Sequence, residues 1–397
     1  MRRLLLPLAA AMILAGGLRP IQAQPGARLD TAALGALQRA AVASHTDALL
    51  VLRDGAPVVE WTVGADEPIE LMSVTKSVVG LAVGRLLTLG LLDSLDQPVH
   101  TVYPEWRQGR KRAITVRHLL THTSGLQDLP STDPEVYPSP DAVQLALAAE
   151  LDDAPGRTYR YSNKAVNLLA GIVHRLSGRP LDRFVADELF RPLGIERYAW
   201  MRDRAGTPYA MAGLALRARD LARLGALVLD RGTWNGQALL DSAVVAAMLT
   251  PSERLPTYGL LWGLVPDRIR YTLDSARVRD LDAARVAPDD LARLWTLGGR
   301  TFDGREALEA ALAETFGATW RATLTTRLGG TAVGLLFRRD VDRIVGAYAE
   351  GYLGQSLLVL PGPRIVAVRQ IRQRPTHVPD TDDFRDFRDR VRALVRD

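Results

Sequence analysis

The chain has 397 residues, of which 47% are hydrophobic and 24% are charged, and these proportions are typical of a globular protein with a sizeable core. They exclude collagen-like, coiled-coil and intrinsically disordered chains. The formal net charge of +5 falls to +2 without residues 1–23, which hold three arginines and no acidic residue, so the charge does not indicate a nucleic-acid-binding protein.

The first 23 residues have the pattern of a secretory signal peptide. Arg2 and Arg3 form a short basic start, Leu4–Leu18 is apolar, and residues 21–23 resemble a small-residue cleavage site. The apolar stretch is short for a membrane span and is broken by glycines. We therefore expect a mature domain over residues 24–397 that is periplasmic or secreted and has no stable membrane span. The alternative is an uncleaved amphiphilic anchor.

Two residue types are scarce. The chain contains no cysteine, which excludes disulfides, catalytic thiolates and cysteine-ligated metals. Only three of the 50 basic residues are lysines, namely Lys76, Lys111 and Lys164. Because arginine is the usual cation of this chain, each lysine is a candidate for a specific role.

A predicted hairpin and a long apolar helix come first in the mature chain. Residues 47–52 and 57–63 are rich in β-formers and flank an Asp-Gly turn at 54–55, which predicts the hairpin. Residues 73–92 are apolar, too long for a strand, and have no broad polar face. This pattern predicts a buried helix that begins near Ser73.

The rest of the chain has helical patterns first and strand patterns after them. Residues 93 to about 250 are mostly helical in pattern, with a clear amphipathic helix over 220–230. Three apolar, β-branched runs then predict strands, and an amphipathic helix follows over 380–397. The three strand runs are 343–349, 355–360 and 364–370.

Strands at both ends and helices between them predict an α/β fold of the α+β type. We expect an antiparallel sheet built from both termini and flanked by helices, with a mainly helical subdomain over about 93–210.

A long segment at about 265–343 precedes the C-terminal strands. Residues 289–297 and 303–314 are helical in pattern, whereas 323–326 and 331–337 are strand-like, and the last run is a candidate for the sheet edge. A segment of this size is not a structureless loop. It either overhangs the active site and restricts substrate size or decorates the far side of the molecule.

Ser73 and Lys76 form the first chemical motif. Residues at i and i+3 share one helix face, so the Lys76 ammonium can reach the Ser73 hydroxyl. Burial lowers the pKa of such a lysine, and a nucleophile beside a desolvated lysine is a known activation scheme. The alternative is a helix-capping serine beside a lysine that extends to solvent.

Two further motifs point to the same chemistry. Tyr161-Ser162-Asn163 stands at a loop-to-helix junction, where a phenol near an ammonium can act as general base. Gly351-Tyr352, inside the glycine-rich run 349–355, links two strands and can supply an oxyanion-hole N–H. Each motif has an alternative explanation when it is considered alone. The Tyr161 motif also fits a partly buried tyrosine followed by a helix-capping Ser-Asn pair. The Gly351-Tyr352 motif also fits a glycine-rich bulge.

Together the three motifs resemble the serine β-lactamase and penicillin-binding superfamily. The resemblance is strongest to the branch with class C β-lactamases, DD-peptidases, family VIII esterases and 6-aminohexanoate-dimer hydrolases, and it covers about residues 47–370. Further segments resemble the same branch: Arg117–Leu126, Ala218–Gly225, Trp234–Gly236 and Tyr258–Trp262.

The resemblance implies roles for six residues. Ser73 would be acylated, Lys76 would hold the proton network, and Tyr161 would act as base and acid. Asn163 would bind polar groups of the substrate, and the N–H groups of Ser73 and Tyr352, next to Gly351, would form the oxyanion hole. A fold like that of β-lactamases and transpeptidases is implied, with a small ester, amide or peptide as substrate and no cofactor.

One departure from the family pattern affects the predicted substrate. Lactamases and peptidases have Lys-Thr-Gly or His-Thr-Gly in the third motif, whereas this chain has Ala349-Glu350-Gly351. The missing cation favours an esterase or a small-amide hydrolase over a β-lactamase or DD-peptidase. A non-catalytic relative that binds cell-wall or peptide ligands is the alternative from another class.

A metal site is not expected. His118 and His122 stand at i and i+4, a spacing that metal pairs use, but no acidic ligand lies between them. The sequence predicts neither the substrate's identity nor the oligomeric state.

Overall fold

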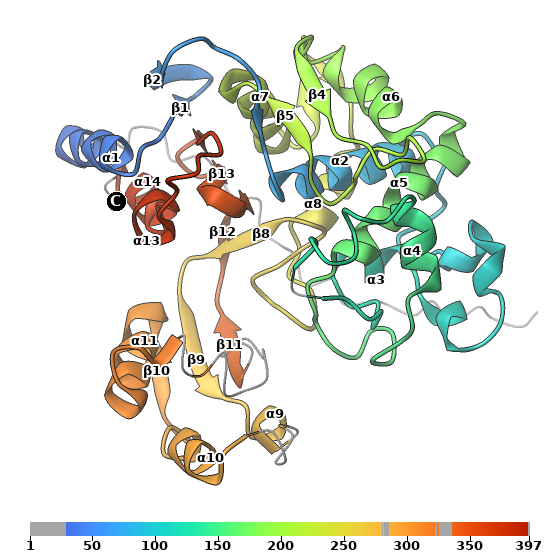
Figure 1. The fold of residues 1–397 in the computed structure, drawn as a ribbon. Helices are drawn as coiled ribbons and strands as arrows, with labels where there is room; N and C mark the ends of the chain where they lie inside the picture. The colour runs from blue at the N-terminus through green and yellow to red at the C-terminus, as the bar shows by residue number, and fades with distance from the viewer. Residues whose placement is uncertain are drawn as a thin grey trace, which may run out of the picture.

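The computed structural model describes residues 29–129, 131–279, 281, 286–321, 324 and 336–395 (Figure 1). The predicted signal peptide and most of the strand-like runs over 323–335 lie outside the described residues. Among the residues that are described, no helix is both long and apolar enough to cross a membrane.

The main sheet has six strands in the order β2-β1-β14-β13-β12-β8, and every neighbouring pair is antiparallel. Its central pair joins strands from opposite ends of the chain, with Leu50 opposite Val368. The prediction of an antiparallel sheet built from both termini is therefore confirmed. The strands are β1 (Ala48–Arg53), β2 (Ala56–Thr62), β8 (Gly263–Pro266), β12 (Ile344–Gly351), β13 (Gln355–Leu360) and β14 (Ile365–Gln370).

Helices cover both faces of this sheet. On one face α2 (Val74–Thr88) packs on β12 and β13, while α7 (Ala218–Leu229) packs on β1, β13 and β14. On the other face α1 (Thr31–Ala43) lies beside α14 (Phe387–Arg392), so the blue and red ends of the chain meet in Figure 1. Successive side chains along a strand point to opposite faces of the sheet, so they pack alternately into two apolar cores, one on each face.

The region between β2 and β8 is mostly helical, as predicted, and also contains short strands. Strands β3, β5 and β4 form a small sheet in that order, and β6 pairs with β7. The helices are α3 (Val116–Leu120), α4 (Ala142–Ala148), α5 (Asn163–Ser177), α6 (Leu181–Val185) and α8 (Ser242–Met248), with a π-helical turn η4 (Ala186–Phe190) and 3-10 turns η1 (Val99–Thr101), η2 (Pro104–Trp106) and η3 (Arg110–Ala113). The strands are β3 (Ile69–Glu70), β4 (Tyr198–Trp200), β5 (Leu214–Leu216), β6 (Thr233–Trp234) and β7 (Gln237–Ala238).

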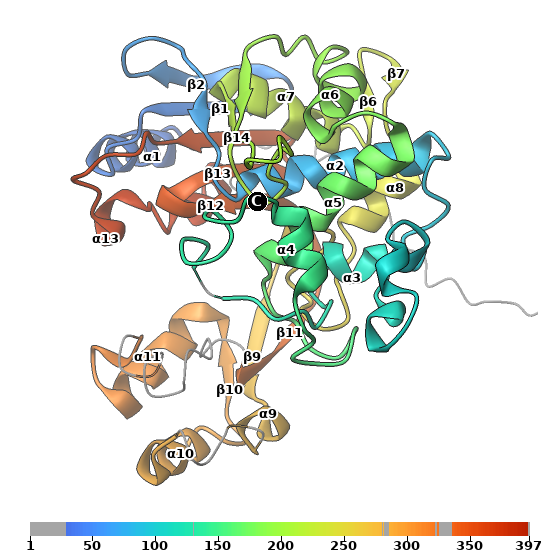
Figure 2. The same ribbon diagram turned by 45° about the vertical axis from the view of Figure 1, so that its right-hand side comes forward.

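The predicted insertion forms a separate unit at the end of β8 and β12 (Figure 2). It has its own sheet, in the order β10-β9-β11, and its own apolar core, which includes Leu294, Leu312 and Phe337. Its elements are β9 (Ile269–Leu273), α9 (Ser275–Arg279), α10 (Pro288–Trp295), β10 (Thr301–Asp303), α11 (Gly304–Phe316) and β11 (Phe337–Val341).

The structure confirms the two helices predicted in this insertion and corrects its strand. The run that ends at Phe337 was a candidate for the edge of the main sheet, but Phe337 begins β11, which pairs with β9. The reason is that β8 already pairs with β12 and occupies that edge.

The predicted C-terminal helix over 380–397 is also corrected, since it is broken into α13 (Pro379–Asp382) and α14. Phe384 lies between them with a left-handed φ of 48°, which a continuous right-handed helix does not allow. Its ring packs edge-on against Phe387, at 5.5 Å between ring centroids, and both side chains are buried under the sheet. Burying two aromatic rings here outweighs helix continuity.

Candidate active site

Ser73 is the residue just before α2, and its side chain makes no capping hydrogen bond to that helix. Met72, just before it, has a left-handed φ of 49°, which turns the chain sharply into the helix. The Ser73 hydroxyl faces two side chains: Lys76 Nζ lies 3.0 Å from its Oγ, and the Tyr161 hydroxyl lies 3.0 Å from the same atom. The structure thus brings the three predicted catalytic residues together around one oxygen.

Lys76 is held in a buried position. Its side chain is 2% exposed, and Nζ donates to the Met211 carbonyl at 2.6 Å in addition to its contact with Ser73. Burial lowers the pKa of Lys76 to about 7, although the Asp128 carboxylate opposes this shift. Near neutral pH a large share of Lys76 therefore carries a free amine, which can accept a proton.

Tyr161 reaches Ser73 from the loop that precedes α5. Its hydroxyl donates to Ser73 Oγ, and Lys76 Nζ lies 4.9 Å from the centroid of its ring. Burial raises the pKa of Tyr161 to about 12, and the hydrogen bond with Ser73 opposes that rise. Because the residue as a whole is 42% exposed, solvent moderates the effect of burial. The phenol is protonated at neutral pH.

His122 is a site residue that sequence reasoning missed. Its Nδ1 accepts a hydrogen bond from the Ser162 N–H at 3.1 Å, and its Nε2 lies 3.2 Å from the Tyr258 hydroxyl. Burial and the charge of Lys76 lower the pKa of His122 to about 3, so the ring is neutral and carries its proton on Nε2. The ring lies 4.4 Å from that of Tyr161 and supports it.

His118 and His122, considered above as a metal pair, have separate structural roles. His118 Nδ1 accepts from the backbone N–H of Thr115 at 3.2 Å and closes a capping box at the start of α3. His122 uses its Nδ1 toward Ser162. The sequence signal for His122 as a site residue was its place inside the segment 117–126.

Asp128 is a second missed residue, and it fixes the start of α5. Its Oδ2 accepts from the Ser162 hydroxyl at 2.8 Å and from the Lys164 N–H at 2.9 Å. A carboxylate at a helix N-terminus is stabilised by the unpaired backbone N–H groups there. Asp128 therefore anchors the turn that carries Tyr161. Its negative charge also favours the protonated form of Lys76.

Gly351 brings the end of β12 against the start of α2. A Cβ at this position would lie 2.5 Å from the Leu71 carbonyl oxygen and 3.0 Å from the Ser73 nitrogen, so only glycine allows this approach. The close approach that this glycine permits is to the backbone at the start of α2. Tyr352 follows in a 3-10 turn, η6 (Tyr352–Gly354), and its side chain is 69% exposed.

Arg369 fixes the η6 turn through hydrogen bonds to its backbone. The residue is fully buried, and it donates to the carbonyls of Leu353 at 2.9 Å and Gly354 at 2.8 Å. It also donates to Thr46 Oγ1 at 2.9 Å and to the Ser44 carbonyl at 2.9 Å. Burial lowers the pKa of Arg369 to about 10, which leaves it charged at neutral pH. One guanidinium thus ties the turn after Tyr352 to the end of α1.

The remaining predicted positions are less directly involved. Asn163 is the first residue of α5 and is partly buried, two residues beyond Tyr161. Ala349 is 3% exposed and belongs to the core under α2. Glu350 points to the other face of the strand, where its carboxylate lies 2.8 Å from Arg388 Nε. Neither of these two β12 side chains supplies a cation to the site.

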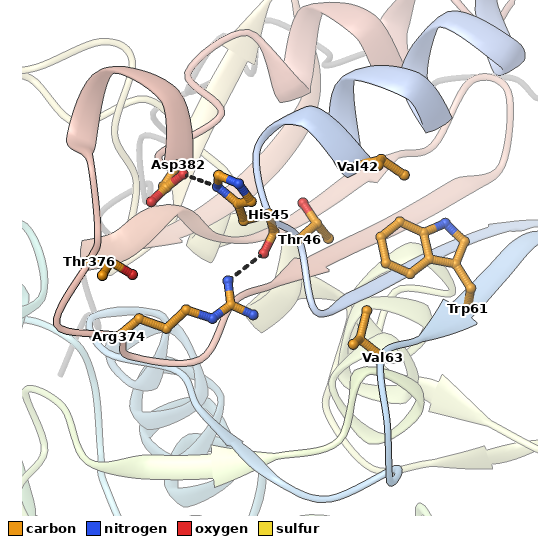
Figure 3. Close-up of a pocket in the computed structure, with 8 residues that line it drawn as sticks. All are labelled: Val42, His45, Thr46, Trp61, Val63, Arg374, Thr376 and Asp382. Atoms are coloured by element: carbon orange, nitrogen blue, oxygen red, sulfur yellow. Dashed lines mark hydrogen bonds and ion pairs between the residues drawn. The ribbon is translucent and has the colours of Figure 1, made fainter.

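A hollow of about 570 Å³ lies elsewhere in the molecule (Figure 3). It opens between the end of α1, strand β2 and the segment after β14. The close-up shows His45 pointing to Asp382, and Arg374 bonded to the backbone oxygen of His45. None of the three predicted catalytic residues lines this hollow.

The family model described as Beta-lactamase matches residues 34–390. The chain belongs to the Beta-lactamase family. This is a family of serine hydrolases, and the predicted resemblance and the predicted fold class are both confirmed.

Two curated relatives carry different names. The chain is 33% identical to "Esterase EstB" of Burkholderia gladioli over 166 residues, which are 36% of this chain and 42% of that protein. It is 28% identical to the "6-aminohexanoate-dimer hydrolase" of Paenarthrobacter ureafaciens over 260 residues, 58% of this chain and 64% of that protein. The chain thus spans less than two thirds of the length of either relative.

Solved structures support the same fold. A penicillin-binding protein homologue from Caulobacter crescentus has a TM-score of 0.58 at 17% identity, over 93% of this chain and 99% of that one. A penicillin-binding protein from Bacillus halodurans has a TM-score of 0.56 at 16% identity, over 90% and 98% of the two chains. At such low identity the likeness concerns the fold alone.

Proposed function

We propose that this protein is a serine hydrolase that cleaves carboxylic esters or small amides through an acyl-enzyme on Ser73. One observation supports this above all: Ser73 Oγ lies 3.0 Å from both Lys76 Nζ and the Tyr161 hydroxyl. A nucleophile within hydrogen-bond reach of a base and of an acid meets the requirement for covalent catalysis.

In the proposed mechanism, Lys76 is the proton acceptor. The free amine of Lys76 takes the proton of Ser73, and Oγ bonds to the carbonyl carbon of the substrate. The backbone N–H groups of Ser73 and Tyr352 stabilise the oxyanion that forms. Family resemblance suggested Tyr161 as the base, but a pKa of about 7 for Lys76 and about 12 for Tyr161 favours the reverse order in the free protein.

Tyr161 then completes the first half of the reaction. Its phenol gives a proton to the leaving alcohol or amine as the bond to the acyl carbon breaks, and the Lys76 ammonium returns that proton to the phenolate. Water next attacks the acyl carbon and loses a proton to the same pair of groups. Ser73 leaves with a proton, which restores the starting state.

The proposed substrate class rests on the third motif. Ala349 is buried and Glu350 is paired with Arg388, so β12 offers no cation for the carboxylate of a β-lactam or a peptide. The names of two relatives, an esterase and a 6-aminohexanoate-dimer hydrolase, agree with an ester or small-amide substrate. The leader-like residues 1–23 support a further proposal, that the protein is exported to the periplasm or beyond.

A hydrolysis panel tests this proposal. Short-chain nitrophenyl esters, 6-aminohexanoate dimer, nitrocefin and D-Ala-D-Ala peptides are compared by kcat/KM, and intact-mass analysis follows the adduct on Ser73. We expect ester or small-amide turnover far above that of nitrocefin. Efficient nitrocefin or peptide turnover would instead identify a β-lactamase or DD-peptidase. Ligand binding without any adduct would identify a non-catalytic relative.

A further inference from the structure

The inserted unit reaches the wall of the candidate site through strand β11. Arg339 on this strand donates from Nη1 to the Thr257 hydroxyl at 3.1 Å. The next residue, Tyr258, has its hydroxyl 3.2 Å from His122 Nε2, and the ring of His122 supports Tyr161. A continuous run of contacts therefore connects Arg339 to the hydroxyl that faces Ser73.

Thr257, the partner of Arg339, precedes a tyrosine that belongs to a cluster of aromatic side chains. Tyr159 lies beside His122 and Tyr258, with ring centroids 5.9 Å and 5.8 Å away. Burial raises the pKa of Tyr159, and the positive charge of Arg339 opposes that rise. The contacts through Thr257 and His122 put Arg339 on the side of the site that holds Tyr161.

The charge of Arg339 is not balanced by a carboxylate among the residues that the structure describes. Two arginines near it have carboxylate partners: Arg270 pairs with Asp340 at 2.8 Å, and Arg343 pairs with Asp267 at 2.8 Å. Arg339 is partly buried and bonds to a neutral hydroxyl. A half-buried guanidinium gains most from a carboxylate, which it binds through two parallel hydrogen bonds.

We propose that Arg339 and Thr257 form an anion subsite that binds a carboxylate on the leaving group of the substrate. The inference rests on the proposed function, in which Tyr161 protonates the leaving group and therefore stands on that side of the scissile bond. The protein prefers esters or amides whose leaving alcohol or amine carries a negative charge.

The test compares two matched esters, 4-butyryloxybenzoate and its neutral counterpart 4-butyryloxybenzamide. We expect the wild-type protein to prefer the anionic ester, and Arg339→Gln to lose about 10-fold to 100-fold in kcat/KM on it, mostly through KM. The same variant should stay within about twofold on the neutral ester. Added salt should weaken the wild-type preference, because the subsite is partly exposed to solvent.

Arg338→Gln is the matched control. Arg338 is exposed on the opposite face of β11, and its replacement removes the same charge from the same strand. We expect it to leave both rates within about twofold. Arg339→Lys, which keeps the charge without the planar fork, should retain part of the preference. Equal losses on both esters in Arg339→Gln, or equal effects of the two Gln variants, would overturn the subsite.

A binding experiment separates this inference from the proposed function. In the Ser73→Ala background, 4-butyryloxybenzoate should raise the melting temperature more than the benzamide does, and Arg339→Gln should abolish that difference. This readout needs no turnover. A protein that hydrolyses neither ester but still shows the Arg339-dependent shift would refute the hydrolase and retain the subsite. No shift with either ligand, at concentrations up to their solubility, would refute the subsite.

Discussion

The start of α2 and the end of β12 meet at the same site and differ sharply in what they contribute. At the start of α2, Ser73 and Lys76 are in direct contact, and Tyr161 completes the group. At the end of β12, Ala349 is packed into the core and Glu350 is paired away from the site, so the strand contributes mainly the backbone near Gly351.

This difference separates reaction from recognition. Attack on a carbonyl requires a nucleophile, a proton acceptor and an oxyanion hole, and none of these depends on the side chains of β12. The choice of substrate depends on groups farther from the bond that breaks. A family member can therefore keep the first region and change the second.

Loss of Ser73 should have the largest effect. Ser73→Ala removes the atom that forms the covalent bond, and we expect turnover to fall by about 10⁴-fold to 10⁶-fold. Stopped-flow kinetics and intact-mass analysis measure the burst and the acyl adduct. A burst that survives in the variant would show that another residue is acylated.

Lys76 should come next. Lys76→Ala should lower kcat/KM by about 10²-fold to 10⁴-fold, the usual contribution of a general base, and Lys76→Arg should be nearly as damaging because arginine does not deprotonate. Lys111→Arg is the control: Lys111 Nζ bonds the Leu147 carbonyl at 3.2 Å on a 3-10 turn away from the site. Near-native activity of Lys76→Arg would show that Lys76 contributes only a positive charge and does not accept the proton.

The pH profile should sharpen the assignment of the base. Lys76 has a pKa lowered to about 7 by burial, and only its free amine accepts the Ser73 proton. We therefore expect kcat/KM to rise about tenfold per pH unit below pH 7 and to level off above it. The inflection should persist in Tyr161→Phe at a lower rate. An inflection that disappears with the Tyr161 hydroxyl would make Tyr161 the base.

The smallest effect should come from β12. Glu350→Gln breaks an ion pair with Arg388 in which both side chains are partly exposed, at 44% and 25%. Such pairs contribute about 0–1 kcal/mol. We expect kcat/KM within about twofold of the native value and a similarly small change in the free energy of unfolding, measured with denaturant. A loss above tenfold in kcat/KM would place the Glu350 carboxylate in the reaction.

Local patterns predicted much of this molecule. The spacing of Ser73 and Lys76 on one helix face is a property of consecutive residues, and the structure has both on the same side of α2. The hairpin turn was equally local, and Asp54 and Gly55 have the positive φ values that a tight hairpin uses. Such features need no knowledge of the rest of the chain.

Contacts between distant segments were harder to predict. Tyr161 was placed beside Ser73 by family resemblance, since 88 residues separate them and no periodicity joins them. His122 and Asp128 act through Ser162, which lies 40 and 34 residues away, and neither has a local signal for that contact. Helix α1 went unpredicted, although it packs beside α14. The run over 331–337 was a candidate for the edge of the main sheet, but its last residue, Phe337, pairs with β9 because β8 already occupies the edge beside β12.

The joining of both termini in one sheet has a consequence for how the molecule forms. Arg369 bonds a residue 323 positions earlier in the chain, and β1 has β14 as its partner. During synthesis β1 therefore cannot pair with β14 until almost the entire chain has been made. Such distant pairings slow folding and leave unpaired strand edges open to aggregation in the meantime. The main sheet is complete only when β14 inserts between β1 and β13.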